Sequence, residues 1–170
     1  MKAAGVMAIM ATQALGSELL VPEEMGGWGY VEDGVMGGVS NGRAAYVDGA
    51  LRMVGSVSTD NNGGFIQVRT RTPGDWPADA QGLELQVRGN GEVYYVFLKT
   101  PELRRVFHSF RAPFETGADW ATVRVAFADF TPSHSGMPEG FTPDQVSSLA
   151  LVAYGRDHEA DLSVRSIRLY

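Results

Sequence analysis

Ser40 is the first residue to weigh for chemistry, because it lies at the centre of the sequence GVSNG at residues 38–42. This sequence matches the G-x-S-x-G pattern, in which a sharp strand-to-helix turn exposes a serine hydroxyl as a nucleophile. The pattern needs a helix directly after the serine, and residues 43–49 are too short a segment to form one before the next turn. We therefore predict that the Ser40 hydroxyl caps a turn and is not a nucleophile.

The acidic run DHEAD, residues 157–161, is the second candidate for chemistry. Its three carboxylates alternate along the chain, so an extended strand would project them from one face. A glycosidase pair or a cation site uses such an arrangement. However, the run separates two apolar segments, where a charged hairpin tip is the ordinary outcome. We expect a solvated loop, and we predict that the chain is not an enzyme.

The sequence also offers little to a metal ion. It has no cysteine, and its three histidines are far apart, with no second ligand at close spacing. Asp60, Asn61 and Asn62 have oxygen atoms that suit calcium, but the two glycines that follow them favour a turn. We therefore predict no metal and no cofactor.

The composition is that of one acidic globular domain. The 170 residues carry a formal net charge of -6, and the positive residues form no block along the chain. Nucleic-acid binding needs clustered lysine and arginine to displace counterions from phosphates. We therefore predict no nucleic-acid partner.

The start of the chain resembles a short secretory signal peptide. Lys2 precedes an apolar stretch at residues 3–11, and small residues stand at positions suited to cleavage after Gly16. We predict that residues 1–16 are removed and that residues 17–170 form a single domain that is periplasmic or secreted. Without this cleavage the protein would be cytoplasmic. No later stretch approaches the roughly twenty apolar residues of a membrane span, so we predict none.

Much of the chain from residue 50 onward alternates apolar and polar residues with a period of two, which indicates β-strands. The sequence GNG at residues 89–91 suits a tight hairpin, because asparagine and glycine tolerate positive φ. Short strands separated by turn residues predict an all-β fold, an antiparallel β-sandwich of the jelly-roll type. The predicted strands are residues 50–58, 64–71, 82–88, 93–100, 104–111, 122–127, 146–154 and 162–170.

Exposed aromatic rings would be the sign of a sugar-binding sandwich. Trp76 stands between a glycine–aspartate pair and a proline, which predicts a loop position. Most rings in a sandwich belong to the core, and we expect this of Phe97, Phe110 and Phe127. The rings that we weigh for sugar contact are Trp28, Tyr30, Trp76 and Trp120.

Two segments, WGYVEDGVMGGVSNG at residues 28–42 and NNGGF at residues 61–65, are unusually rich in glycine. Glycine is entropically costly to order, so these segments need backbone angles or close approaches that a side chain would forbid. Loops on a rigid sandwich often carry the binding residues. We predict that these two loops either bind a partner or brace each other, with Met36 and Phe65 as apolar contacts. The candidate residues are Trp28, Asp33, Met36, Ser40, Asn61, Asn62 and Phe65.

Residues 28–42, DGALRMVGSVS at residues 48–58 and NNGGFIQVR at residues 61–69 resemble, in order and spacing, the complex I intermediate-associated protein 30 family. The resemblance implies a galactose-binding-like jelly roll and a non-catalytic role in the assembly of respiratory complex I. The implied partners are subunits of an NADH:quinone oxidoreductase or of another membrane complex. Carbohydrate-binding modules share this fold, so a carbohydrate-binding module of the cell envelope is the alternative.

Overall fold

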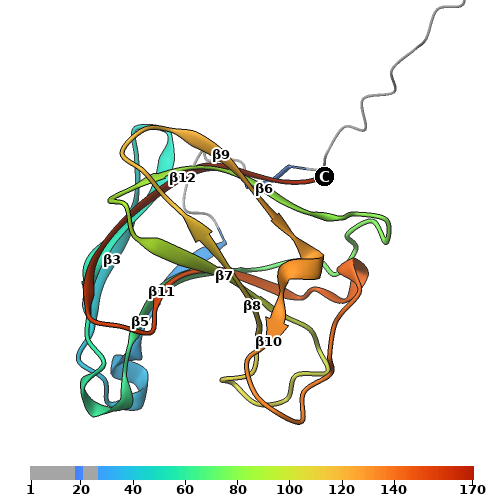
Figure 1. The fold of residues 1–170 in the computed structure, drawn as a ribbon, viewed down its shortest axis with the longest axis horizontal. Coiled ribbons are helices and arrows are strands. Elements are labelled where there is room, and N and C mark those ends of the chain that lie inside the picture. The colour runs from blue at the N-terminus through green and yellow to red at the C-terminus, as the bar shows by residue number, and fades with distance from the viewer. Residues whose placement is uncertain (1–17, 21–26) are drawn as a thin grey trace, which may run out of the picture.

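The computed structural model describes residues 18–20 and 27–170, which form two six-stranded antiparallel sheets packed face to face (Figure 1). In the first sheet the strand order is β3-β4-β12-β6-β9, with β1 paired to β12, and in the second it is β10-β8-β7-β11-β5-β2. The predicted signal segment, residues 1–16, lies outside the described residues.

The first sheet consists of β1 (Glu18–Leu20), β3 (Asn41–Val47), β4 (Ala50–Val57), β6 (Gly82–Gly89), β9 (Ala121–Ala126) and β12 (His158–Leu169). The second sheet consists of β2 (Trp28–Glu32), β5 (Phe65–Arg71), β7 (Val93–Lys99), β8 (Phe110–Glu115), β10 (Thr131–Pro132) and β11 (Ser148–Tyr154). Short 3-10 helices lie in the connections: η1 (Asp33–Met36), η2 (Asp60–Asn62), η3 (Phe127–Asp129) and η4 (Pro143–Gln145). Within these described residues, no helix is both long and apolar enough to cross a bilayer.

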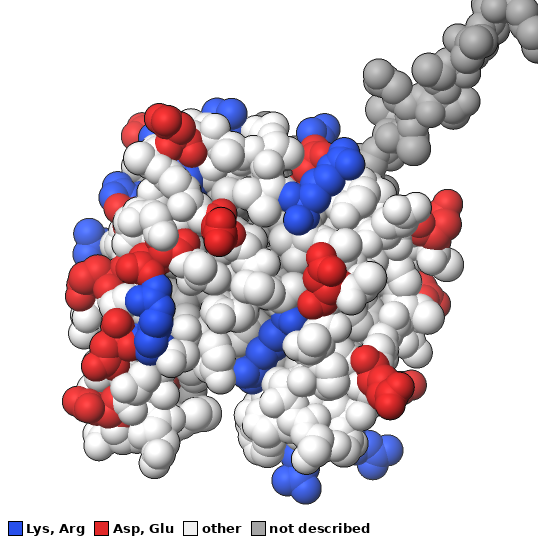
Figure 2. Space-filling model, in the orientation of Figure 1, with Lys and Arg blue, Asp and Glu red and all other residues white. Residues whose placement is uncertain are grey.

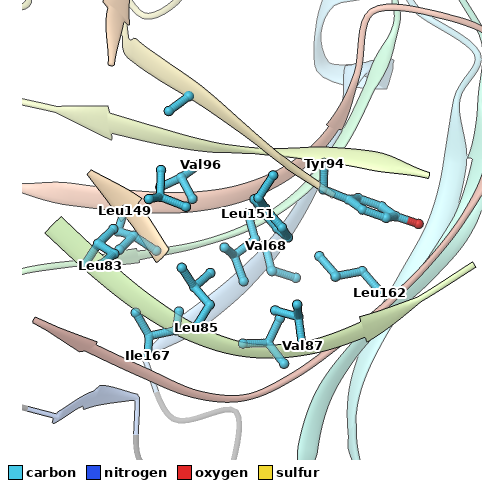
Figure 3. Close-up of a cluster of buried hydrophobic side chains, with 14 of the residues drawn as sticks. Val68, Leu83, Leu85, Val87, Tyr94, Val96, Leu149, Leu151, Leu162 and Ile167 are labelled. Atoms are coloured by element: carbon cyan, nitrogen blue, oxygen red, sulfur yellow. The ribbon is translucent and has the colours of Figure 1, made fainter. Parts of the chain in front are cut away.

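The core lies between the sheets, where alternate residues of each strand meet (Figure 3). Consecutive strand residues point to opposite faces, so the period of two sends one side chain in each pair inward. Full burial of a leucine or valine side chain contributes about 1.5–3 kcal/mol, so this layer dominates the stability of the sandwich. Its central side chains include Val68, Leu83, Leu85, Tyr94, Val96, Leu149, Leu151, Leu162 and Ile167.

One predicted strand is wrong. Residues 104–109 form a turn, with the His108 N–H donating to the Arg105 carbonyl, and β8 begins only at Phe110. The reason is strand pairing. β7 ends at Lys99, and the first residue of β8 that pairs with β7 is Phe110, which lies opposite Leu98. The sequence pattern of residues 104–111 is therefore not realised as a strand. The sequence pattern also did not predict β3 or the shorter strands β1, β2 and β10.

The acidic run also differs from the expected loop. Asp157 lies in the turn, but β12 begins at His158 and contains Glu159 and Asp161. This part of β12 pairs with β4 from His158 opposite Val57 onward, so ladder hydrogen bonds hold the charged residues in a strand. A regular partner strand thus overrides the local preference of polar residues for a loop.

Tyr94 gives a test of the core that leaves its apolar packing intact. The Tyr94 hydroxyl is buried, donates to Asn90 Oδ1 at 2.7 Å and accepts from the Asp161 N–H at 2.8 Å. Burial raises the pKa of Tyr94 to about 12, so the neutral phenol is the form that persists. Tyr94→Phe should lower the free energy of unfolding by about 1–2 kcal/mol in urea denaturation, because it leaves the Asp161 N–H unpaired.

Tyr46→Phe is the matched control, because Tyr46 is only half-buried on the edge strand β3. This substitution should change the free energy of unfolding by less than about 0.5 kcal/mol. Equal losses for the two variants would contradict the role given to the buried hydroxyl.

Candidate functional site

The loop after β2 is organised around the carboxylate of Asp33, which is fully buried. Asp33 Oδ2 accepts hydrogen bonds from the Ser40 hydroxyl at 2.5 Å, the Gly64 N–H at 2.6 Å and the Phe65 N–H at 3.2 Å. Asp33 Oδ1 accepts from the Ser40 N–H at 3.0 Å. Burial by itself raises the pKa of Asp33, but these hydrogen bonds outweigh it and hold the pKa below its ordinary value. An ionised carboxylate therefore ties the loop after β2 to the start of β5.

Two glycines of the sequence motifs make room for this carboxylate. A Cβ atom at Gly38 would overlap Asp33 Cγ, and a Cβ atom at Gly63 would overlap Asp33 Oδ2. A third, Gly37, has a φ of 87° and ends η1 in the left-handed region, which few other residues adopt. The glycine-rich segments thus provide the space around the buried Asp33 carboxylate and the turn that ends η1.

Ser40 continues this network to the other sheet. Its hydroxyl donates to Asp33 Oδ2, and its Oγ accepts from the N–H of Ser58, just after β4, at 2.9 Å. The side chain is buried, whereas a nucleophile elbow holds its hydroxyl in the open. The geometry therefore gives Ser40 a structural role, in which its hydroxyl links the end of one sheet to the end of the other.

The other predicted site residues do not converge on one point. Trp28 and Phe65 are half-buried, and Trp28 packs against the core. Met36 is 57% exposed at the end of η1. Asn61 and Asn62 are exposed in η2 with φ of 56° and 59°, a conformation that asparagine tolerates better than most residues. The structure therefore joins the Asp33 carboxylate and Ser40, to which Phe65 adds only its backbone N–H, and it does not bring the side chains of these five residues together.

The acidic run has structural contacts of its own. Asp157 accepts hydrogen bonds from the N–H and the hydroxyl of Thr59, at 2.7 and 2.8 Å, and these bonds hold its pKa below the ordinary value. Asp161 pairs with Arg52 at 2.7 Å. In residues 18–20 and 27–170, no three or more of histidine, aspartate and glutamate are grouped as a metal site requires.

The outer face of the second sheet carries a cluster of aromatic and cationic side chains. On β7, Tyr95, Phe97 and Lys99 alternate with the inward residues of the core. The ring of Tyr154 meets those of Tyr95 and Phe97 edge-on, with centroids 5.8 and 5.5 Å apart. The guanidinium carbon of Arg111 lies 4.3 Å from the Phe97 centroid. We call the following residues the basic-aromatic face: Arg69, Tyr95, Phe97, Lys99, Arg111 and Tyr154.

Sequence reasoning missed this face, and the expectation that Phe97 belongs to the core is wrong. Phe97 lies on the outer side of β7, opposite Arg111 of β8. Nearly every residue of β7 is apolar, so alternation does not reveal its outward side. The available signal was Lys99, which stands two residues after Phe97 and therefore shares its face.

Trp76 does not present a ring to a sugar, although it lies in a loop as predicted. Its side chain is buried, and its ring stacks on that of Phe127 with centroids 5.9 Å apart. Trp120 is half-buried beneath two arginines, with the guanidinium carbons of Arg88 and Arg165 at 5.0 and 4.5 Å from the ring centroid. The tryptophans of the sequence therefore give no open stacking platform of the kind that a sugar site needs.

A shallow pocket on the outer face of the first sheet is a weaker candidate site. Its lining includes Arg52, Arg88, Asp161 and Ser163. There Asp161 pairs with Arg52, and Arg88 lies over the ring of Trp120. The basic-aromatic face differs because none of its cations has an acidic partner among the described residues.

Solved structures show the fold class of this sandwich. A family 11 carbohydrate-binding module from Clostridium thermocellum, solved in complex with a β-1,3-1,4-mixed-linked tetrasaccharide, superimposes with a TM-score of 0.74 at 16% identity, over 89% of this chain and 93% of that chain. A family 30 carbohydrate-binding module of a Clostridium thermocellum cellulase gives 0.53 at 16% identity, over 71% and 73%. An agarase gives 0.62 at 10% identity, over 91% of this chain and 24% of that chain. The shared fold is the galactose-binding-like jelly-roll β-sandwich, as predicted.

The sequence identifies the family within this class. The model of the complex I intermediate-associated protein 30 family matches residues 18–164. This chain belongs to the complex I intermediate-associated protein 30 family, and the resemblance of the glycine-rich motifs is confirmed. No curated protein matches the chain.

Asp33→Asn tests the buried carboxylate. The amide keeps the size of the side chain but places an NH₂ group where N–H and O–H donors converge, so at least one buried donor loses its acceptor. We expect the free energy of unfolding at pH 7 to fall by about 3 kcal/mol in urea denaturation.

Asp48→Asn is the control, because Asp48 is exposed and its φ of 51° suits asparagine equally well. It should change the free energy of unfolding by less than about 0.5 kcal/mol. A comparable loss in both variants would refute the special position of Asp33.

Acid should remove the same stabilisation. The pKa of Asp33 in the folded protein is below the value of about 3.9 for an unfolded aspartate. The ionised carboxylate therefore stabilises the fold above about pH 4, and the stabilisation is lost as the pH falls through the folded value. The difference in unfolding free energy between wild type and Asp33→Asn should shrink as the pH falls below about 4, so it should be smaller at about pH 3 than at about pH 6. A difference that stays constant over this range would show that the charge is not what matters.

Proposed function

We propose that this protein is a non-catalytic binding protein that assists the assembly of a respiratory NADH:quinone oxidoreductase or of another membrane complex. The observation that carries the proposal is the family match over residues 18–164. The description of that family names an association with an intermediate of complex I, and the match spans nearly the whole described chain. The buried, hydrogen-bonded state of Ser40 supports a role without catalysis.

The braced loop after β2 supports such a role physically. Val35, Met36 and Val39 are exposed on it, while Asp33 holds its backbone to β5. Exposed apolar side chains gain free energy when a partner covers them. A loop that is ordered before binding also pays less entropy when it docks. This combination suits temporary cover of a partner surface during assembly.

The predicted export signal determines on which side of the membrane the partner would be met. Our proposal is that cleavage after Gly16 places the mature protein in the periplasm. Sequencing of the mature N-terminus tests this directly. A start near Ser17 would restrict the partner to periplasmic surfaces, and an intact Met1 would place the protein in the cytoplasm.

The experiment for the assembly role is deletion of the gene, followed by native gels of the membrane fraction. The amount of assembled NADH:quinone oxidoreductase should fall, and the tagged protein should co-purify with partly assembled intermediates. Restoring the gene should return the complex to its normal level. Normal amounts of the complex in the deletion strain would sink the proposal in this organism.

Carbohydrate binding is the second candidate function, supported by the rings of Tyr95, Phe97 and Tyr154 on the outer face of the second sheet. The solved modules that share this fold support it at the level of architecture. A glycan array with the purified protein is its test. Binding to a defined polysaccharide would favour this candidate, and no binding across envelope and plant polysaccharides would count against it.

A further inference from the structure

Three cations on the outer face of the second sheet lack a carboxylate partner. Among the described residues, none of Arg69, Lys99 and Arg111 is within ion-pair distance of an acidic side chain. The chain has a net charge of -6, so carboxylates are in excess and yet leave this cluster uncompensated. Burial lowers the pKa of Lys99, and the charges of Arg69 and Arg111 lower it further, while the Lys99 ammonium donates to the Val106 carbonyl. Among the other described arginines, carboxylates pair with Arg52, Arg124, Arg156 and Arg168, whereas arginines such as Arg43 and Arg88 also have no ion pair, so this face is distinguished by the clustering of its cations.

The guanidinium of Arg111 is held in place before any ligand arrives. Its carbon lies 4.3 Å from the centroid of Phe97 and 4.9 Å from that of Tyr154. Its Nε donates to Ser109 Oγ at 2.8 Å, and its Nη2 donates to the Phe107 carbonyl at 3.3 Å. A guanidinium has five N–H donors, so donors remain for a ligand. Since the side chain is already ordered, it binds a carboxylate with little further loss of entropy.

The strand register sets the two arginines on a line that crosses the sheet, and Lys99 stands beside this line, two residues after Phe97 on β7. Arg69 of β5, Ala150 of β11, Phe97 of β7 and Arg111 of β8 are successive paired neighbours. Adjacent strands are about 4.8 Å apart, so the Cα atoms of the two arginines are separated by about 14 Å. An extended polypeptide that lies across the strands covers this distance in about four residues.

The molecule is hollowed on one side between two groups of loops. Figure 2 shows a notch in the lower margin of the molecule, between two lobes. In the same view of the ribbon, the loops at residues 33–40 and 58–64 form the left lobe, and the loop at residues 100–109, with the segment after β10, forms the right lobe (Figure 1). The strands of the second sheet run between these lobes, so loops wall the basic-aromatic face at both strand ends.

Both walls carry exposed apolar side chains. Val35 is 75% exposed and Met36 57% on the first wall, and Val106 is 83% exposed and Phe107 45% on the second. Apolar side chains of this kind gain free energy when apolar groups of a protein cover them. Enrichment in arginine, aromatic residues and methionine is also typical of the core of a protein interface. A polar glycan chain would make little use of these valines, so the walls favour a protein ligand.

We propose that the basic-aromatic face binds an extended segment of a partner protein in which acidic and apolar residues alternate. The carboxylates of that segment meet Arg69, Lys99 and Arg111, and its apolar side chains meet the walls at Met36 and Val106. This inference rests on the proposed function, because it takes the partner to be a protein. An acidic glycan shares the carboxylate chemistry and is the alternative outcome of the test.

The first measurement uses the full chain and a fluorescein-labelled peptide of about nine residues, alternating glutamate and valine, followed by fluorescence anisotropy. Affinity should fall at least about tenfold when NaCl rises from about 0.05 M to about 0.5 M, because salt screens exposed charges. A peptide with glutamine in place of glutamate should bind at least about tenfold more weakly. Equal binding of the two peptides would overturn the proposal.

Single substitutions locate the binding surface. Arg69→Gln changes an exposed side chain and should weaken binding of the glutamate–valine peptide about tenfold. Arg43→Gln, at an exposed position of β3 in the other sheet, should leave it unchanged. Val106→Ser should weaken binding about threefold or more, with Val47→Ser on β3 as the apolar control. Full affinity in both Arg69→Gln and Val106→Ser would place the peptide elsewhere and overturn the proposal.

Competition separates the two ligand sources. Unlabelled glutamate–valine peptide should displace the probe at a lower concentration than an oligogalacturonate of equal charge. If the oligogalacturonate displaces the probe at the lower concentration, the ligand of this face is an acidic glycan and the proposal of a protein segment is overturned.

Complementation of the deletion strain separates this inference from the proposed function. A double variant, Arg69→Gln with Lys99→Gln, should bind the probe poorly and restore less of the assembled complex than wild type. If deletion lowers the complex and the double variant restores it fully, the inference fails and the assembly role stands. If the peptide binds as expected and deletion leaves the complex normal, the assembly role fails and the face remains a binding site for an acidic protein segment.

Discussion

The buried carboxylate of Asp33 is the interaction on which one end of the sandwich depends. An ionised group away from water costs several kcal/mol unless donors satisfy it. Here four N–H or O–H donors do so, and they come from Ser40, Gly64 and Phe65. Through the serine hydroxyl the network reaches Ser58 at the end of β4. A single charge therefore fixes the positions of two loops, residues 33–40 and 58–64, and the strand ends that they join in both sheets.

This constraint also explains why the most distinctive sequence motifs resemble a reaction site. Burial of a carboxylate with converging backbone N–H groups demands close packing, and only glycine fits at Gly38 and Gly63. The serine in the G-x-S-x-G pattern is part of the same packing. The glycine and serine residues of the motifs that identify the family thus accommodate the buried Asp33 carboxylate. The exposed side chains of the same loops are free to contact a partner.

The Asp33 network and the proposed binding face meet at the loop after β2. The carboxylate network holds the loops at one end of the strands in a defined shape. The outer face between the loops carries cations that the protein leaves uncompensated, over rings that keep Arg111 in place. Loops that are ordered before binding, with charged side chains between them, lower the entropy lost when a ligand is ordered. This is the physical basis for the proposed binding at the basic-aromatic face.

Much of the fold follows from patterns that are local in the sequence. Alternation in residues 82–88 and 122–127 predicts β6 and β9, because one inward side chain in two is a property of any half-buried strand. The pattern of residues 104–111 predicts a strand that does not form, because strand formation also needs a paired neighbour, and β7 has already ended. Likewise, His158 to Asp161 join β12 because β4 extends alongside them.

The sequence by itself determined the fold class, most of the strands and the family, because these rest on local periodicity and on motifs in a fixed order. Only the tertiary structure decided which donors meet Asp33, which side of β7 faces outward and which cations have no partner. The physical reason is that these properties are set by contacts between residues far apart in the chain. Arg69 and Arg111 belong to one surface only because β11 and β7 lie between their strands in the sheet.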